Sequence, residues 1–457
     1  MFKKGDLFEI NIETLAYGGE GIGRLNGITV FVPDSVPGDY LKIEIVSVKK
    51  NYARGIIQEI IKPSEYRISP VCSLAKVCGG CQWLHIDYKE QLRAKKKIVE
   101  ESLKKIANID IPVHDVISSD CNLEYRCKIQ FPVQQTKVSK RILAGYYKKG
   151  THEIVNIKFC PIQPEIINQI TQFTREKAQE LNLTAYNEKT GKGLIRHLVY
   201  RYSQSHKNLL LIVVINSLDI PDKLKQLCKS VQDNFKEIAG VLVNFNTSGT
   251  NIIMSYKTEL ACGRDYIEEN LEGKKFKISA GSFFQVNPAA AVKIFNEVHK
   301  IIKKRVENPT ILDVYAGVGT FSIWLKDLAA KITAIEENSN AVSDVRENIK
   351  LNKSENDADI DILEGNADRV LQDLIEQTSN FDVTILDPPR KGCSDVAIDA
   401  VARLTNKFII YVSCNPTTLA RDIKLLMKSG FIPEYAQPID MFCHTYHIES
   451  IVVLKRE

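Results

Sequence analysis

The sequence contains no long hydrophobic run and no apolar block near its start. Although 44% of its 457 residues are apolar, no stretch approaches the roughly 18 consecutive apolar residues that a membrane-spanning helix needs. The opening, MFKKGDLFEI, also lacks the apolar segment of a secretory signal peptide. We therefore expect a cytoplasmic protein with no membrane partner.

Without a secretory signal, the eleven cysteines are not expected to form a disulfide framework. A chain of this length has room for two or three domains, each with its own hydrophobic core. The cysteines therefore need another explanation, and the spacing of four of them suggests a metal site.

Basic charge is concentrated in one part of the chain. The formal net charge is only +5, but residues 91–150 hold 13 Lys and Arg against 6 Asp and Glu. Cations mixed with aromatic rings suit phosphates and unstacked bases, although a solvated lysine-rich surface would look the same. The residues concerned are Lys137, Lys140, Arg141, Tyr146, Tyr147, Lys148 and Lys149.

The first sixty residues alternate short apolar runs with glycine-rich turns. Gly18-Gly19 and Pro37-Gly38 are turn signals, and the pattern predicts a small OB-like β-barrel of a kind that often binds nucleic acid. With glycines also at 21 and 23, residues 1–61 resemble the TRAM domain, an RNA-binding barrel attached to RNA-modifying enzymes. The expected strands are 7–12, 28–32, 40–49 and 53–61.

Residues 62–270 have a mixed pattern without a detectable repeat, and we expect a middle α+β domain. A helix is predicted from 88 to 107. The continuous apolar run NLLLIVVIN at 208–216 predicts a buried strand.

Residues 271–457 alternate strands and helices in the rhythm of a parallel sheet. This pattern predicts a doubly wound, Rossmann-like α/β domain whose ligands bind at the carboxyl ends of its strands. The expected strands are 310–314, 331–335, 359–363, 383–386, 408–412 and 449–454.

Three cysteines lie within ten residues in the motif Cys72-x5-Cys78-Gly-Gly-Cys81. The glycines let the backbone turn tightly enough for the last two thiols to reach one centre. Cys160 is the candidate fourth ligand, because it precedes a proline and a Cys-Pro pair ends cluster-binding runs in other iron–sulfur proteins. Four thiolates fit either a zinc ion or a [4Fe–4S] cluster. Full ligation predicts a structural role.

A glycine turn follows the first expected strand of the last domain, in the sequence ILDVYAGVGTF. Gly317 and Gly319 allow a ligand to approach the backbone closely. Glu336 ends the next strand about twenty residues later, where a carboxylate can hold a ribose diol. Ser322 stands where a dinucleotide-binding fold has its third glycine, so the pattern favours S-adenosylmethionine over NAD.

The motif Asp387-Pro-Pro-Arg390 follows the expected strand 383–386. A similar motif occurs in enzymes that methylate exocyclic amines, where an aromatic residue after the prolines stacks on the base. Arginine in that place argues against amine methylation.

Cys414, in the motif SCNP, follows the expected strand 408–412, where it would face the cofactor. Alone it could equally be a buried structural thiol. Carbon 5 of uracil is too weak a nucleophile to attack a sulfonium methyl group, but a thiolate added to carbon 6 converts the ring into an enolate that can. The adduct must then lose its C5 proton. Glu449, at the start of the last expected strand, can act as the base.

Four motifs occur in order along the chain: C-x5-C-G-G-C, S-F-F-Q-V-N, D-P-P-R-K-G and S-C-N-P. Over nearly its full length the chain resembles the RNA uracil-5 methyltransferases that modify 23S ribosomal RNA and carry a TRAM domain and a [4Fe–4S] cluster. The resemblance implies S-adenosylmethionine as cofactor and 23S rRNA as partner, and it favours iron–sulfur over zinc. It implies Cys414 as nucleophile and Glu449 as base, Gln285, Tyr315, Glu336 and Asp387 as cofactor contacts, and Cys72, Cys78, Cys81 and Cys160 as cluster ligands.

The chain departs from that family at two positions. Ala316 stands where the family often has cysteine, and Cys443 stands where it often has proline. Neither position has a role in the mechanism. Tyr125-Arg126 matches a position that faces RNA. Related tRNA enzymes generally lack the barrel and the cluster cysteines, which favours ribosomal RNA. The alternatives are a tRNA uracil-5 methyltransferase, a cytosine-5 methyltransferase, and a catalytically inactive RNA-binding protein. A monomer is expected.

Overall fold

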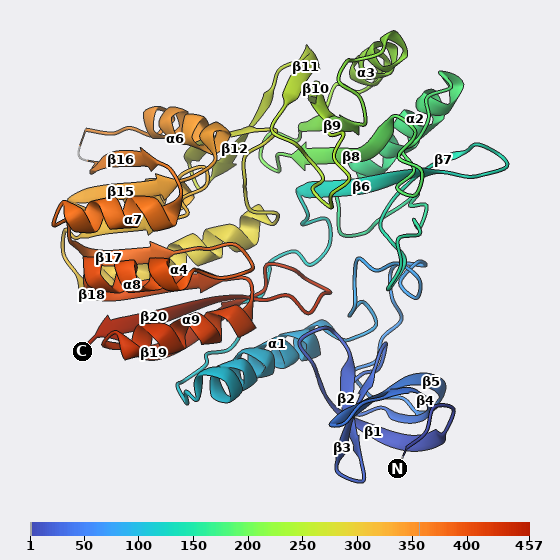
Figure 1. The fold of residues 1–457 in the computed structure, drawn as a ribbon, viewed down its shortest axis with the longest axis horizontal. Coiled ribbons are helices and arrows are strands. Elements are labelled where there is room, and N and C mark those ends of the chain that lie inside the picture. Colours follow the sequence, from blue (N-terminus) through green and yellow to red (C-terminus); the bar gives the residue numbers. More distant parts are fainter. Residues whose placement is uncertain (1, 356) are drawn as a thin grey trace.

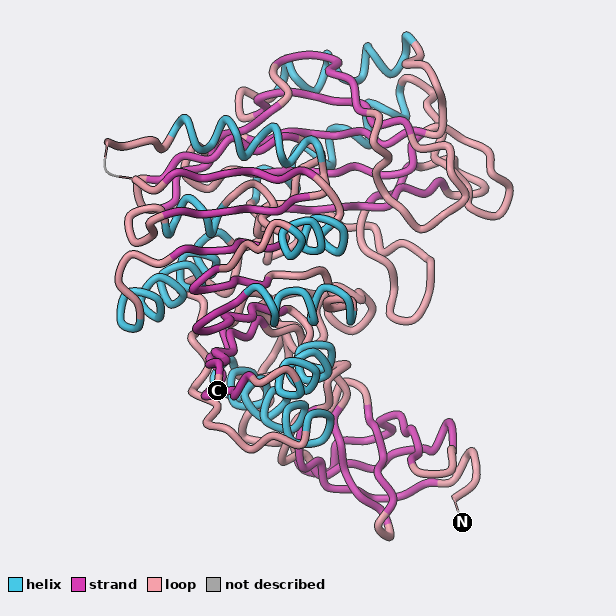
Figure 2. The backbone as a smooth tube through the Cα atoms, turned by 60° about the vertical axis from the view of Figure 1, so that its left-hand side comes forward, coloured by secondary structure: helices cyan, strands magenta, loops and turns pink. Residues whose placement is uncertain are grey.

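The computed structural model describes residues 2–355 and 357–457. Along the chain, its strands form a closed barrel, a six-stranded sheet, a two-stranded ribbon and a seven-stranded sheet (Figure 1). Figure 2 shows the barrel at one end of the molecule, beside the N-terminus, with the larger sheets beyond it. The predicted α/β architecture with an N-terminal OB-like barrel is confirmed, whereas the domain limits 1–61, 62–270 and 271–457 stay a prediction.

The barrel closes in the strand order β1-β2-β3-β5-β4. Along β4, the buried residues Leu41, Ile43 and Ile45 alternate with partly exposed ones, so that one face of the strand fills the barrel core. The strands are β1 (Leu7–Leu15), β2 (Gly21–Leu25), β3 (Ile28–Val32), β4 (Tyr40–Val48) and β5 (Tyr52–Lys62).

Strand β2 is absent from the sequence prediction, which placed a turn at Gly18-Gly19 and used Gly21 and Gly23 only for the resemblance to the TRAM domain. Gly21 and Gly23 are nevertheless required in the strand. A Cβ on Gly21 would lie 2.0 Å from the Ser35 hydroxyl, and one on Gly23 would lie 2.4 Å from the Asn11 carbonyl oxygen. Close approach of neighbouring backbone thus explains glycines that strand propensity alone disfavours.

The middle sheet has the order β11-β10-β9-β8-β6-β7. The predicted buried strand at 208–216 is confirmed as β9, and all seven of its residues are buried because β8 and β10 flank it and helices cover the sheet (Figure 1). The elements are β6 (Lys128–Gln135), β7 (Ile142–Ala144), α2 (Glu165–Glu180), β8 (Ile195–Tyr202), β9 (Leu209–Ile215), α3 (Asp222–Asn234), β10 (Ile238–Phe245) and β11 (Thr258–Gly263), followed by the ribbon β12 (Tyr266–Leu271) and β13 (Lys274–Ser279).

The helix predicted from 88 to 107 is confirmed as α1 (Tyr88–Ser102), continued by one π-helical turn over Leu103–Ala107. Asp87 caps its first turn by accepting a hydrogen bond from the Lys89 amide. The helix lies beside α9 and β19 of the last domain, between that domain and the barrel (Figure 1). No helix among the described residues is both long and apolar enough to cross a membrane.

The last domain is a seven-stranded sheet in the order β16-β15-β14-β17-β18-β20-β19. The first five strands in this order are parallel, and β20 runs antiparallel to β18. The elements are α4 (Pro288–Arg305), β14 (Thr310–Val314), α5 (Thr320–Leu325), β15 (Lys331–Glu336), α6 (Ser339–Leu351), β16 (Asp359–Glu364), α7 (Ala367–Glu376), β17 (Phe381–Leu386), α8 (Asp395–Leu404), β18 (Thr405–Ser413), α9 (Pro416–Lys428), β19 (Phe431–Ile439) and β20 (Glu449–Arg456).

Candidate active site

The candidate residues of the last domain lie along one edge of its sheet. Strand order places Glu336 at the end of β15, Tyr315 just beyond β14, Asp387 just beyond β17 and Cys414 just beyond β18. Because β20 runs in the opposite direction, its first residue, Glu449, reaches the same edge. The order of strands therefore runs from the expected cofactor turn to the expected nucleophile and base.

The glycine turn between β14 and α5 has the shape expected of a cofactor site. Gly317 and Gly319 have φ angles of 60° and 80°, which glycine adopts without strain. The Gly317 amide donates a 2.8 Å hydrogen bond to Glu336, which ties the turn to the end of β15. Ser322 donates from both its amide and its hydroxyl to the buried Asp313. Serine thus has a structural role where dinucleotide folds have glycine.

The S-F-F-Q-V-N segment lies between this turn and the loop before Glu449. A Cβ on Gly317 would lie 3.9 Å from the Phe283 ring. At the other end of the segment, the Asn287 side-chain amide donates to the Met441 carbonyl at 3.3 Å. Arg201, from β8, donates to the Ser282 carbonyl and holds the segment in place. The partly buried Gln285 is therefore positioned between the cofactor turn and the loop that leads to Glu449.

Strand register brings Cys414 and Glu449 together. Ser413 pairs with Ser450 across the antiparallel β18–β20 ladder. The next residue in each direction, Cys414 after β18 and Glu449 in β20, therefore follows the same register. Adjacent strands lie about 4.8 Å apart. Cys414 also immediately precedes Asn415, whose side chain caps α9. The side-chain amide of Asn415 donates to the Arg390 carbonyl at 3.0 Å, joining the S-C-N-P and D-P-P-R motifs.

Burial and the acidic groups around Cys414 favour the protonated form of its thiol. Burial raises the pKa of Cys414 to about 12; Glu449 and Asp387 add to the rise, and Arg390 opposes it. Burial, with the neighbouring Asp387, also raises the pKa of Glu449 well above its ordinary value. Burial raises the pKa of Asp387 to about 7, with Asp313 contributing. The edge therefore holds carboxyl groups with the raised basicity that general bases need.

Helix α1 fixes the loop between β19 and β20 that leads to Glu449. Lys95 and Asp440 form a fully buried ion pair of 2.6 Å, and Lys95 also donates to the Phe442 carbonyl at 3.0 Å. Gln91 accepts a hydrogen bond from the His444 amide. Lys95 lies on the buried face of an otherwise amphipathic helix. A lysine on the apolar face of a predicted helix is the sequence signal by which Lys95 could have been found.

The four predicted cluster ligands line one small cavity, away from the sheet edge. Cys72, Cys78, Cys81 and Cys160 meet there among apolar side chains such as Leu84. Burial raises the pKa of Cys160 to about 12, with Cys78 and Cys72 contributing. Among the described residues, no group of three or more His, Cys, Asp or Glu side chains is arranged so that it could hold a metal ion. All eleven cysteines are free thiols.

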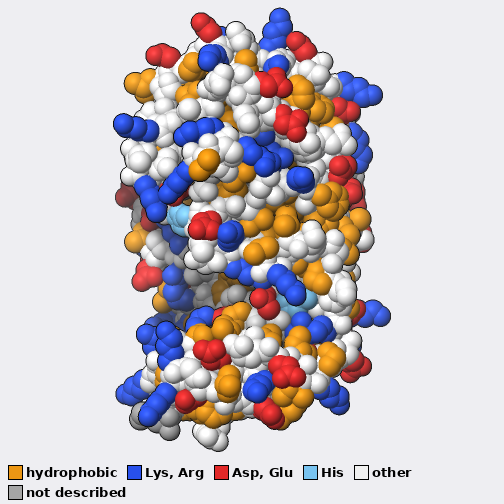
Figure 3. Space-filling view, turned by 90° about the vertical axis from the view of Figure 1, so that its right-hand side faces the viewer, with side chains coloured by type: hydrophobic (Ala, Val, Ile, Leu, Met, Phe, Trp, Pro, Cys, Tyr) orange, Lys and Arg blue, Asp and Glu red, His pale blue; other side chains and the backbone are white. Residues whose placement is uncertain are grey.

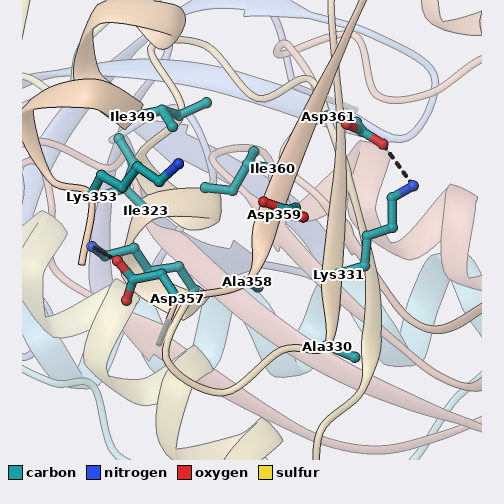
Figure 4. Close-up of a pocket in the computed structure, with 11 residues that line it drawn as sticks. Ile323, Ala330, Lys331, Ile349, Lys353, Asp357, Ala358, Asp359, Ile360 and Asp361 are labelled. Atoms are coloured by element: carbon teal, nitrogen blue, oxygen red, sulfur yellow. Dashed lines mark hydrogen bonds and ion pairs between the residues drawn. The ribbon is translucent and has the colours of Figure 1, made fainter. Parts of the chain in front are cut away.

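A second cavity of about 360 Å³ lies at the amino ends of strands in the last sheet, opposite the ends that hold the candidate residues. Its lining includes Lys331 and Asp359, the first residues of β15 and β16. Lys331 reaches across to Asp361 in a 2.7 Å ion pair (Figure 4). Because ligands of doubly wound folds bind at the carboxyl ends of strands, this cavity is not the cofactor site.

Comparison with known proteins agrees with this arrangement. A family model described as tRNA (Uracil-5-)-methyltransferase matches residues 87–457, and a TRAM domain model matches residues 2–57. The chain belongs to the uracil-5 methyltransferase family. It is a SAM-dependent RNA methyltransferase with an RNA-binding TRAM barrel.

Individual relatives of this methyltransferase span almost the whole chain. An uncharacterized RNA methyltransferase of Caldanaerobacter subterraneus is 35% identical, with 99% of both chains covered. Another, from Clostridium acetobutylicum, is 36% identical, with 99% and 98% covered. The crystal structure of Pyrococcus abyssi tRNA (uracil-54, C5)-methyltransferase in complex with S-adenosyl-L-homocysteine is 26% identical. It has a TM-score of 0.74, covering 98% of this chain and 100% of that one.

One expectation drawn from the resemblance is wrong, because Tyr125 of the methyltransferase does not face RNA. Its side chain is 1% exposed, and its hydroxyl donates to the Cys443 carbonyl at 3.0 Å. Through this hydrogen bond, Tyr125 supports the loop before Glu449. Tyr17 and Tyr446, by contrast, were not among the predicted site residues. Their rings meet with centroids 5.4 Å apart, and the Tyr446 ring lies 4.2 Å from that of His447, two residues before Glu449. Only tertiary packing brings Tyr17 to this loop, so the sequence holds no signal for it.

Proposed function

We propose that this methyltransferase acts on carbon 5 of a uracil in folded RNA through a covalent adduct with Cys414. The proposal rests on the β18–β20 register. Continued by one residue beyond the Ser413–Ser450 pair, this register brings Cys414 next to Glu449, at the sheet edge that also holds the glycine turn. A nucleophile, a base of raised pKa and a nucleotide-binding turn on one edge suit this reaction better than methylation of an amine, which needs no cysteine.

Cys414 gives up its thiol proton to water and forms a bond from its sulfur to carbon 6 of the uracil, and the electrons displaced from the C5–C6 double bond make carbon 5 nucleophilic. After carbon 5 has gained its methyl group, Glu449 removes the original C5 proton. The electrons of that C–H bond restore the double bond and expel the Cys414 thiolate. The target base must leave its stack to reach this edge, so we propose a flipped-out uracil in a loop.

S-adenosylmethionine, when bound, supplies an electrophilic methyl group. The residues present suit it. The positive-φ glycines bring exposed backbone to the ligand, and Glu336 lies at the turn where a ribose would be held. We propose Gln285, Tyr315, Glu336 and Asp387 as the residues that contact it. Tyr315 itself has a φ of 69°, a conformation unusual for a bulky residue and associated with functional turns.

We propose 23S rRNA as the substrate, on the resemblance in barrel and cysteine motif described above. A second candidate, tRNA, is supported by the likeness to the Pyrococcus abyssi enzyme, which is named for uracil 54 of tRNA and covers the full length of this chain. Because that alignment includes the barrel region, the barrel alone does not separate the two substrates.

We also propose that Cys72, Cys78, Cys81 and Cys160 bind a [4Fe–4S] cluster of structural role. Four thiols lining one apolar cavity support it. Protein purified without oxygen should be brown and contain about four irons per chain. A colourless protein containing zinc would contradict the cluster.

The covalent mechanism is tested with two variants and [methyl-3H]-labelled cofactor on RNA from cells that lack the protein. Cys414→Ala should abolish methyl transfer while S-adenosylmethionine still binds in calorimetry. Glu449→Gln should instead accumulate a protein–RNA adduct that survives denaturing electrophoresis. An active alanine variant would rule out the nucleophile, and no adduct with Glu449→Gln would assign the proton to another base.

The substrate is tested by mass mapping of 5-methyluridine in ribosomal and transfer RNA. Loss of one or more 23S rRNA sites in the deletion strain, restored by wild-type protein but not by Cys414→Ala, is the expected result. Loss confined to tRNA would establish the second candidate.

A further inference from the structure

The turn between β1 and β2 of the barrel packs directly against the catalytic domain. Gly19, with a φ of +93°, has room for no side chain: a Cβ there would lie 3.0 Å from Gln82 and 3.2 Å from the Tyr446 ring. The Trp83 indole donates to the Gly19 carbonyl at 3.0 Å, and the Trp83 amide donates to the His444 carbonyl at 3.0 Å. The barrel is thereby locked to the loop that carries Glu449.

This contact places a tyrosine of the barrel against the loop that leads to Glu449. The rings of Tyr17 and Tyr446 meet edge to face with centroids 5.4 Å apart, and the Tyr446 ring lies 4.2 Å from that of His447, two residues before Glu449. Burial raises the pKa of Tyr17 to about 12, and Tyr446, Cys414 and Glu449 all add to the rise. Tyr17 is only partly buried and lines the cleft described next, so part of its ring is open to another flat group.

The two tyrosines stand at one end of a cleft of about 1100 Å³ between the barrel and the middle domain. Figure 3 shows a hollow above the barrel, with Lys and Arg side chains around it. Tyr147, Lys148 and Lys149 of the basic segment line the cleft on the side of the middle domain. The volume exceeds the roughly 300–1,000 Å³ of small-molecule pockets, so it suits a polymer.

The chemistry of the cleft favours nucleobases over bare phosphates. Its cations are already engaged: Lys149 pairs with Asp34 at 2.5 Å, and Lys148 pairs with Glu153 at 2.7 Å. The cleft is also lined by the aromatic rings of Tyr17, Tyr147 and Tyr446. Aromatic rings beside cations suit the faces of unstacked bases.

We propose that Tyr17 is a substrate-binding residue of the active site, on which a nucleobase next to the target uridine stacks while the flanking single-stranded RNA follows this cleft. The inference rests on the proposed function and adds to it a role for the barrel. The TRAM barrel then forms one wall of the active site, in addition to holding RNA at a distance.

The test is steady-state methylation of RNA from the deletion strain by three variants. Tyr17→Leu keeps apolar bulk but removes the ring. It should raise KM about 5- to 150-fold with kcat little changed. The reason is that loss of stacking on a flanking base weakens binding of the ground state and of the transition state equally. Tyr17→Phe keeps the ring and should behave as wild type. Tyr40→Leu, at a partly buried barrel tyrosine outside the cleft, is the matched control.

Equal KM values for Tyr17→Leu and wild type would overturn the inference, as would a loss shared by Tyr40→Leu. A second measurement does not depend on variant folding. A transcript of the methylated RNA with 4-thiouridine replacing part of its uridine should, on irradiation of wild-type protein, cross-link to residues 16–20. Cross-links confined to other regions would also overturn it. Failure of the wild-type protein to methylate any RNA would instead contradict the proposed function, so the two failures are distinguishable.

Discussion

Arg390 opposes the effect of the two carboxyl groups on Cys414. Glu449 and Asp387 add to the burial that raises the thiol pKa to about 12, while Arg390 lowers it. The pKa of Glu449 is likewise raised by burial and by Asp387, and lowered by Arg390. In the proposed mechanism the thiolate is the nucleophile, so a cation after the Pro-Pro pair would favour the attacking form of Cys414, whereas an aromatic residue there would serve base stacking.

Replacement of Arg390 by Met should move the pH dependence of methyl transfer to higher pH. Without the guanidinium, the thiol pKa rises further, and below that pKa the thiolate fraction falls tenfold for each unit of increase. We expect a slower rate at pH 7 that recovers partly by pH 9, measured as kcat against pH. Lys391→Met removes the neighbouring exposed cation, which does not contribute to the thiol pKa, and should leave the profile unchanged. Identical profiles for both variants would contradict this role.

Among individual residues, the sequence predicted those whose positions follow from strand ends. Glu336, Asp387, Cys414 and Glu449 each adjoin a strand of one sheet, and the carboxyl edge of such a sheet gathers them by topology alone. Tyr17 could not be predicted, because its place against Tyr446 depends on how the barrel docks. Docking depends on surface shape, which periodicity does not record.

At the scale of elements, the sequence missed strands that contain unusual residues. Strand β19, with the sequence FIPEYAQPI, holds two prolines and was not expected. It lies at the edge of the sheet, where proline costs no ladder hydrogen bond. Residues 112–117 cover part of that edge, since the His114 amide donates to the Ala436 carbonyl at 2.9 Å. Edge position is a property of the assembled sheet, so local propensity could not reveal it.

Strand β2 offers a test of why its glycines are needed. Gly21→Ala should destabilise the protein by about 1–3 kcal/mol, the usual cost of overpacking, because the new methyl group would displace Ser35, whose hydroxyl donates to the Val32 carbonyl at 2.8 Å. Gly249→Ala, where a Cβ would have nothing within 4 Å, is the control. Urea unfolding measures both. Equal stability of the two variants would show that the barrel adjusts without cost.

At the scale of the whole molecule, the loop before Glu449 is where all three regions meet. Trp83 joins it to the barrel turn, Tyr125 supports it from the middle domain, and Lys95 binds it through Asp440. Glu449, the proposed base, is therefore positioned by groups distant in sequence.

The buried Lys95–Asp440 pair allows positioning to be separated from stability. Lys95→Met leaves Asp440 buried without its cation and should cost about 3–5 kcal/mol. The double variant Lys95→Met/Asp440→Leu removes both charges, so most of that stability should return in urea unfolding. Methyl transfer should stay low in the double variant, because the Phe442 carbonyl loses its bond from Lys95 and the Tyr88 hydroxyl its bond to Asp440, so the loop is held less firmly. Full recovery of activity together with stability would mean that the pair contributes to folding alone.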